Sequence, residues 1–107
     1  MHLAMKYEIR EVPGRVVVAL AGEIDLDASP ELRELLLCRI EGDLHVDLRE
    51  VQYIDSSGIA TLVEALQAAR RQGSDFALAG ISEPVARVLE LARLDQVFTI
   101  LDGHGDA

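Results

Sequence analysis

Aromatic residues and cysteine are scarce in this sequence. Its 107 residues include no tryptophan, two phenylalanines, two tyrosines and one cysteine, while half of all residues are hydrophobic, so we expect an aliphatic core. The single Cys38 excludes an intramolecular disulfide, and without a cysteine cluster a structural zinc site is not expected. We predict no metal and no cofactor, and we expect Cys38 to be a partly buried, small apolar residue.

Long apolar runs and an excess of basic residues are missing too. No stretch reaches the roughly 18 apolar residues that a membrane span needs, and the first residues lack the apolar segment of a secretion signal. Ten basic against nineteen acidic residues give a net charge of −9 at pH 7. This charge argues against direct binding of nucleic acid or an anionic membrane surface. We expect a cytoplasmic protein without membrane insertion, whose acidic surface suits either a basic protein partner or solubility alone.

Several enzyme motifs are absent as well. A serine hydrolase of the common type would have a G-x-S-x-G turn, whereas the residues around the serine pair read I-D-S-S-G-I. A phospho-aspartate receiver domain would have a lysine near the end of its last strand, but the one lysine of this chain is Lys6. A glycine-rich phosphate loop, as in many kinases, is also missing. We therefore predict that the chain is not an enzyme.

Strand-like and helix-like segments alternate over a length that suits one domain, residues 1–107, with a core of about 7–101. Strand patterns cover 7–12, 15–22, 44–48, 75–80 and 96–101, and helix patterns cover 30–40, 56–72 and 83–94. This order indicates an α/β fold with a mostly parallel sheet and right-handed crossovers. Pro13-Gly14 is a turn signal, so the first strand should be antiparallel to the second. The almost continuously apolar run at 15–22 is typical of a strand buried on both faces.

The helix boundaries carry recognisable signals. Ser29 is the expected N-cap of the first helix, with Pro30 at its first position, and Ser82 is the expected N-cap of the third. Gly73 is well suited to close the second helix. Core-facing positions recur at helical spacing in all three helices: Leu32, Leu35, Leu36 and Ile40; Ile59, Leu62, Val63, Leu66 and Ala69; Val85, Val88 and Leu89, with Leu91 or Ala92.

The stretch Asp55-Ser56-Ser57-Gly58 stands between an apolar strand and the second helix. Binding sites in α/β folds lie outside the carboxyl ends of the strands, and a helix start tolerates phosphate because of its free N–H groups and positive dipole end. One interpretation is that Asp55 or Ser56 caps the helix and nothing more. The other is a serine phosphoswitch on a binding surface, in which one of the two hydroxyls is modified.

Three segments of the chain resemble the STAS domain family, specifically its single-domain anti-sigma-factor antagonists. "GEIDLDASPELRELL" is similar to the family's G-E-[IL]-D segment and first helix. "VDLREVQYIDSSGIATLVEAL" is similar to the central signature D-L-x-x-V-x-[FY]-[IM]-D-S-[ST]-G-[IL], and "GSDFALAGISEPVARVLELARLDQVFTI" is similar to the C-terminal half. The resemblance implies a right-handed β-α superhelix whose helices pack on one face of the sheet.

The resemblance also implies a function. In the family, the unphosphorylated form binds an anti-sigma factor that is also a serine kinase, and so releases the sigma factor. That kinase phosphorylates the second hydroxyl residue of the motif, which is Ser57 here with Ser56 as the alternative, and a PP2C-type phosphatase reverses it. Asp25 matches the aspartate of the G-E-[IL]-D segment, which lies near the phosphoacceptor. The expected partner-binding residues are Asp25, Asp55, Ser56, Ser57, Gly58 and Ile59.

Stand-alone members of this family also serve other systems. Some belong to other partner-switching pathways, and others are accessory subunits of lipid-transport ABC complexes. The intact serine pair favours a phosphoswitch over the lipid-transport role, whose members often alter that motif.

Overall fold

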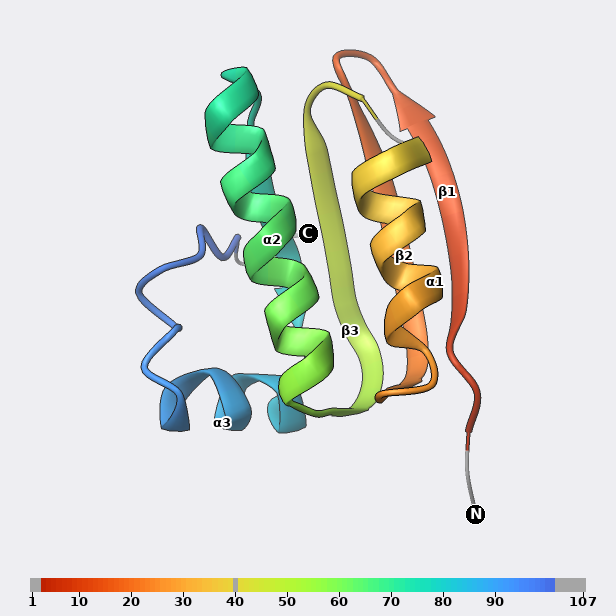
Figure 1. The fold of residues 1–107 in the computed structure, drawn as a ribbon, viewed down its shortest axis with the longest axis vertical. Coiled ribbons are helices and arrows are strands. Elements are labelled where there is room, and N and C mark those ends of the chain that lie inside the picture. The colour runs from red at the N-terminus through yellow and green to blue at the C-terminus, as the bar shows by residue number, and fades with distance from the viewer. Residues whose placement is uncertain (1–2, 40, 102–107) are drawn as a thin grey trace.

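The computed structural model describes residues 3–39 and 41–101, and its centre is one mixed sheet with the strand order β1-β2-β3-β4 (Figure 1). The strands are β1 (Lys6–Val12), β2 (Arg15–Ile24), β3 (Leu44–Ile54) and β4 (Phe76–Ile81). β1 is antiparallel to β2, whereas β2, β3 and β4 are mutually parallel. The predicted mixed sheet with an antiparallel first strand is therefore confirmed.

Three helices complete the fold. α1 (Ser29–Glu34) continues into a short π-helical segment, η1 (Leu35–Arg39), and is followed by α2 (Ser56–Gln72) and α3 (Glu83–Leu91). α1 and α2 lie in front of the sheet in Figure 1, and both begin at the end where β2 and β3 finish. None of the helices within the described residues has the length and apolar character needed to cross a membrane.

The core of the described residues is one mainly aliphatic cluster, which also includes Phe76 and Phe98 and to which the sheet and all three helices contribute. The fully buried members include Val18, Leu20, Leu32, Leu48, Leu62, Leu78, Val85 and Leu89. These residues recur at period two in the strands and at helical spacing in the helices, as the sequence predicted. Ile40, also predicted in this core, lies outside the described residues.

The prediction that β2 is buried on both faces is wrong. Val18, Leu20 and Ile24 are buried, but the alternate positions Val17 and Ala19 are half-buried. The strand therefore has one well-covered face, in keeping with α1 and α2 lying on the same side of the sheet (Figure 1). Val17 and Ala19 on the less covered face are apolar too, and this is why the sequence suggested burial on both faces.

The predicted last strand at 96–101 is also wrong. Only Ile100 forms a bridge, in parallel with Leu78, and the hydrogen bonds Leu78 N–H to Thr99 O and Leu101 N–H to Leu78 O are both 2.8 Å long. α3 ends at Leu91, and a turn over residues 95–97 followed by a bend at Phe98 occupies the first half of the predicted strand, so no ladder forms there. Phe98 instead turns inward, 6.3 Å from Phe76 between ring centroids.

The last expected core position of α3, Leu91 or Ala92, is exposed, and so is Cys38. Leu91, in the last turn of α3, is 80% exposed, and Ala92 is exposed beside it, because the helix ends before another turn can pack. Cys38 is exposed rather than partly buried, since it lies off the apolar stripe of α1 and η1. The buried face of α3 therefore rests on Val85 and Leu89.

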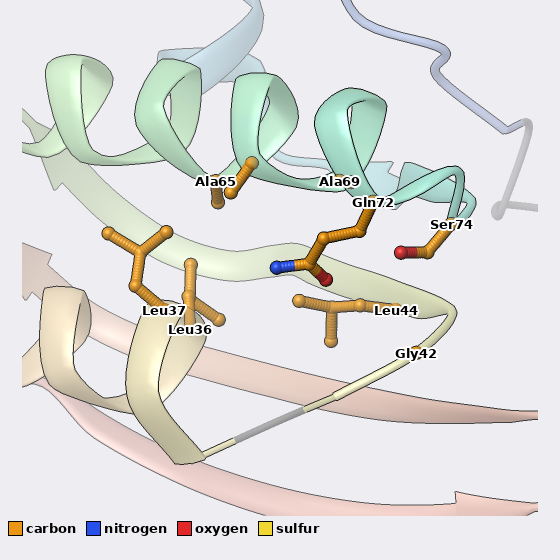
Figure 2. A pocket seen from close by; sticks show the side chains of 9 residues that line it. Leu36, Leu37, Gly42, Leu44, Ala65, Ala69, Gln72 and Ser74 are labelled. Atoms are coloured by element: carbon orange, nitrogen blue, oxygen red, sulfur yellow. The ribbon is translucent and has the colours of Figure 1, made fainter.

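A small pocket lies at the end of the molecule where α2 finishes (Figure 2). It has a volume of about 30 Å³, which leaves space for no more than a few water molecules. Gln72 extends across it from α2, and Ser74 lies at its edge. The apolar lining residues are Leu36, Leu37, Leu44, Ala65, Ala68 and Ala69.

Candidate functional site at the start of α2

The site forms where two parallel strands finish side by side. Ile24, the last residue of β2, is paired with Ile54, the last residue of β3, and the Asp55 N–H donates to the Ile24 carbonyl over 3.1 Å. The loops that follow, one leading into α1 and the other into α2, are therefore neighbours. This is the carboxyl edge of the sheet, where the sequence predicted a site.

Asp55 is the N-cap of α2, with extended backbone and a carboxylate turned toward the helix. Its Oδ1 accepts from the backbone N–H groups of Ser57 at 2.9 Å and Gly58 at 3.2 Å, which satisfies two donors that a helix start leaves open. The same atom accepts from the Ser57 hydroxyl at 2.6 Å. Of the two expected caps, Asp55 and Ser56, the structure uses Asp55.

Opposing influences act on the pKa of the Asp55 carboxyl. Burial raises it, but hydrogen bonds from the Ser57 hydroxyl and from the backbone N–H groups of Gly58, Ser57 and Leu26 lower it. The net pKa lies below the ordinary aspartate value, so the group is an anion at neutral pH. The hydrogen bond from Ser57 is therefore charge-assisted, in keeping with its short length.

The Ser57 hydroxyl has a second neighbour on the other loop. Its Oγ lies 2.8 Å from the Oγ of Ser29, and the Ser29 hydroxyl donates to the Asp25 carbonyl over 2.9 Å. Asp25 in turn accepts from the Ala28 N–H through its Oδ1 at 3.0 Å, which folds the loop into a tight turn. The three residues thus join the loop before α1 to the start of α2.

Ser29 is not the N-cap that the sequence predicted. The cap position is Ala28, which makes no side-chain cap, and Ser29 is the first residue of α1. Its side chain is 8% exposed and points across to Ser57, which is more favourable for a buried hydroxyl than facing the apolar core.

The predicted site residues differ in exposure. Ser56 is exposed and Ser57 is half-buried, whereas Gly58 and Ile59 are buried. A Cβ on Gly58 would lie 2.7 Å from Ile24 Cγ2 and 2.8 Å from Ile54 Cγ1, so the absent side chain lets α2 approach the strand ends. Direct partner contact by Gly58 or Ile59 stays a prediction.

The sequence analysis did not anticipate that Leu26 and Ser29 lie beside this site. The backbone N–H of Leu26 donates to the Asp55 carboxylate, and Ser29 contacts Ser57. Leu26 is 72% exposed in the loop between β2 and α1, and its only signal was an apolar residue placed between Asp25 and Asp27. Ser29 was predicted, but as a cap. Among the described residues, no three His, Cys, Asp or Glu side chains gather closely enough to hold a metal ion.

The chain is similar to known proteins over most of its length. Residues 6–107 match the family model of the STAS domain. The chain is 30% identical over 95 residues to the anti-sigma-B factor antagonist of Bacillus subtilis, covering 87% of each protein. It is 34% identical over 89 residues to the protein of the same name from Staphylococcus epidermidis, covering 80% of this chain and 82% of that one.

Solved structures agree on the fold. The crystal structure of an anti-sigma factor antagonist from Mycobacterium paratuberculosis matches with a TM-score of 0.80 at 22% identity, over 92% of this chain and 86% of that one. The phosphorylated form of the Bacillus cell fate determinant SpoIIAA matches with a TM-score of 0.72 at 17% identity, over 94% of each chain. With the family match, the strand order and the serine pair at the carboxyl edge of the sheet, this chain belongs to the STAS domain family.

Proposed function

We propose that this chain is an anti-sigma-factor antagonist, a binding protein whose unphosphorylated form captures an anti-sigma factor with serine kinase activity and so releases a sigma factor. The names of the curated relatives support this role. The observation that carries it is the Ser57 hydroxyl, held at the start of a long helix by a charge-assisted hydrogen bond to Asp55. The Asp55 carboxylate already caps the helix, so capping alone does not require the Ser57 hydroxyl.

Ser57 is the proposed phosphoacceptor, with Ser56 as the alternative. Ser57 has its Oγ fixed by neighbours at 2.6 Å and 2.8 Å, so the nucleophile is presented in one orientation. Ser56 is the more exposed of the two. A kinase that selected by exposure would choose Ser56, whereas one that selected by geometry would choose Ser57.

Phosphorylation is proposed to block binding through charge rather than through unfolding. A phosphate adds about −1.5 to −2 charges beside an ionised Asp55. The helix dipole favours an anion by about 0.3–1 kcal/mol, and carboxylate repulsion at a partly exposed site opposes it by a similar amount, so stability should change little. A partner surface that accommodates a neutral hydroxyl would bury an unpaired dianion, which costs several kcal/mol and weakens affinity by roughly a hundredfold or more.

The other expected roles follow from the same proposal. The protein would act in the cytoplasm, without enzyme activity of its own, and a PP2C-type phosphatase would restore the unphosphorylated form. The lipid-transport alternative is not favoured, because the curated relatives described above carry the antagonist name. The acidic surface, with a net charge of −9, suits a basic partner surface.

Mapping the modified residue tests the site. We expect incubation with the cognate anti-sigma kinase and ATP to place one phosphate on Ser57, detected by mass spectrometry of the digested protein. Ser57→Ala should abolish it and Ser56→Ala should not. Phosphate on Ser56 alone, or none with a kinase that binds, would contradict the assignment.

Paired melting and binding measurements test the mechanism. We expect Ser57→Asp to melt within a few degrees of the wild type and to bind the anti-sigma factor more weakly by calorimetry. Ser57→Ala should bind but resist switching. If Ser57→Asp melts far lower and loses binding only in proportion to unfolding, phosphorylation acts by unfolding the domain and the charge mechanism is wrong.

An activity assay tests the expectation that the chain is not an enzyme. Turnover of an ester or nucleotide that disappears in Ser57→Ala would make the chain an enzyme instead.

A further inference from the structure

The two hydroxyls at the site do not carry enough protons for their contacts. Three short contacts run in a row from Asp55 Oδ1 to Ser57 Oγ, to Ser29 Oγ and to the Asp25 carbonyl, at 2.6, 2.8 and 2.9 Å. The carboxylate and the carbonyl at the two ends can only accept. Two hydroxyl protons must therefore serve three contacts, and one contact lacks a proton at any moment.

Charge decides where the first proton lies. The Ser57 hydroxyl donates to the ionised Asp55, because this contact is the shortest of the three and charge-assisted. The second proton, on Ser29, is then shared between the Asp25 carbonyl and the Ser57 oxygen. The Asp25 carbonyl also accepts from the backbone N–H groups of Ala28 and Ser29, both at 3.0 Å. The Asp25 carbonyl therefore keeps two hydrogen bonds when the Ser29 hydroxyl rotates away from it, so this rotation costs little free energy.

We propose that Ser29 is a positioning residue of the phosphoswitch, whose hydroxyl turns from the Asp25 carbonyl to Ser57 and donates to the phosphorylated side chain. This inference rests on the proposed phosphorylation of Ser57. Transfer of the γ-phosphoryl group of ATP forms an O–P bond at Ser57 Oγ, breaks the O–H bond, and releases ADP and a proton. The modified residue then loses its donor to Asp55 and becomes an acceptor beside the Ser29 hydroxyl.

Burial makes this donor effective. Ser29 is 8% exposed, so water competes poorly for its hydroxyl, and its side chain is already directed at Ser57. A hydrogen bond to the phosphate favours the dianion over the monoanion and lowers the second pKa of the phosphoserine. Ser29 would thereby help to hold the phosphorylated form in one orientation against the surrounding acidic groups.

The ionisable side chains nearest the phosphate along the chain are acidic, whereas the basic ones of the same helices lie in later turns: Arg33, which is paired with Glu64 at 3.0 Å, and Arg70 and Arg71 in the last turn of α2. The acidic ones are Asp55 before α2, Asp25 and Asp27 in the other loop, and Glu31 in the first turn of α1. Their repulsion raises the second pKa of the phosphate in every variant that keeps them. A difference between variants at Ser29 therefore reports on the Ser29 hydroxyl.

The test is a ³¹P NMR titration of the full chain with phosphoserine introduced at position 57 during translation. Phosphoserine ordinarily has a second pKa of about 6. We expect Ser29→Ala to raise that pKa by about half a unit and Ser29→Thr, which keeps a hydroxyl, to stay near the wild type. Equal pKa values in wild type and Ser29→Ala would overturn the proposal, because the phosphate would then point away from Ser29.

A matched control is available in the same region. Thr61 is the other buried polar residue among those described, 4% exposed, and its hydroxyl donates to the Ser57 backbone carbonyl over 3.0 Å rather than to the side chain. Thr61→Val should leave the phosphate pKa unchanged, and an equal rise in this variant would show a general loosening of the site and overturn the proposal. If Ser29→Ala fails to fold, Ser29→Cys keeps the size with a weak donor and should show the same rise.

The result is independent of any kinase, because the phosphate is introduced without one. Absence of phosphorylation by a bound anti-sigma factor would contradict the proposed function and leave this titration intact. An unchanged titration, with phosphate mapped to Ser57 by the kinase, would contradict the role of Ser29 and leave the proposed function intact.

Discussion

The two ends of α2 meet the same requirement by different means. At its start, Asp55 caps the helix and two further hydroxyls, of Ser57 and Ser29, extend the network to the neighbouring loop. At its end, Gly73 adopts φ 74°, and its N–H donates to the carbonyls of Ala69 and Arg70, next to the small pocket that Gln72 and Ser74 also line. One cap suffices at the end. The additional hydroxyls at the start therefore point to a task other than closing the helix.

The difference between the two ends separates stability from function. Changes at the end of α2 should alter the free energy of unfolding and leave partner binding per folded molecule unchanged. Changes at the start should alter binding or phosphorylation by more than their effect on stability explains. Four substitutions, two of them paired with a control variant, test this separation in order of decreasing expected effect.

Leu36→Ala should cause the largest loss of stability. Leu36 is 4% exposed and lines the pocket at the end of α2, so its truncation enlarges an existing void and should cost about 2–5 kcal/mol. Urea unfolding measures this loss. Leu37→Ala, a half-buried neighbour that lines the same pocket, should cost less. Weaker partner binding by the fully folded Leu36→Ala protein would contradict the separation of the two ends.

Gly58→Ala should disturb both stability and function. The new Cβ would approach Ile24 and Ile54 closer than 3 Å, and these side chains are buried and branched, so neither can move aside cheaply. We expect a loss of about 1–3 kcal/mol, partly offset by the better helix propensity of alanine. Phosphorylation of Ser57 should slow beyond this loss, because the helix start shifts. A kinase assay at a temperature where the variant is fully folded checks it.

Asp55→Asn should make stability less dependent on pH. The pKa of Asp55 is lowered in the folded protein, so its contribution is present above the unfolded value of about 3.9 and is lost as the pH falls through the folded pKa. Asparagine caps a helix well but does not titrate in this range. We expect the difference in melting temperature between wild type and Asp55→Asn to be constant near neutral pH and to close below about pH 4.

Asp47→Asn is the control for this titration. The Arg49 side chain, 2.7 Å away through its Nη2, lowers the pKa of Asp47, mainly by hydrogen bonding. The difference in melting temperature between wild type and Asp47→Asn should disappear in the same acidic range, but phosphorylation of Ser57 should be unaffected. Slower phosphorylation in Asp47→Asn would show that the two carboxylates are not functionally distinct.

Gly73→Ala should have the smallest effect. The position has a positive φ of 74°, but a Cβ added there would meet no atom within 4 Å, so the cost is backbone strain of about 1 kcal/mol without a steric clash. Thermal melts should show a drop of a few degrees, with phosphorylation and binding unchanged. Comparison with Gly58→Ala then contrasts two glycines, Gly73 at the C-cap, which is suited to its positive φ, and Gly58 inside α2, where a side chain would clash.

Sequence patterns predicted the local features well and the edges of the fold less well. The cap at Asp55 and the closing Gly73 were predictable, because each acts on backbone groups within four residues. The strand at 96–101 was not formed, since a turn occupies residues 95–97 and Ile100 alone of the predicted strand forms a bridge. The exposure of Leu91 and Cys38 depends likewise on where each helix leaves the core.

By itself, the sequence determined the mixed sheet, the order of the helices and the Asp55–Ser57 start of α2, since hydrophobic period and side-chain contacts with nearby backbone fix these features. The tertiary structure decided that Ser29 meets Ser57, although 28 residues separate them. Parallel pairing of β2 with β3 brings their carboxyl ends to one edge, and the absent side chain of Gly58 lets α2 begin close to that edge. The spacing of residues along the chain does not indicate that approach, so only the three-dimensional structure shows that the Ser29 hydroxyl belongs to the site.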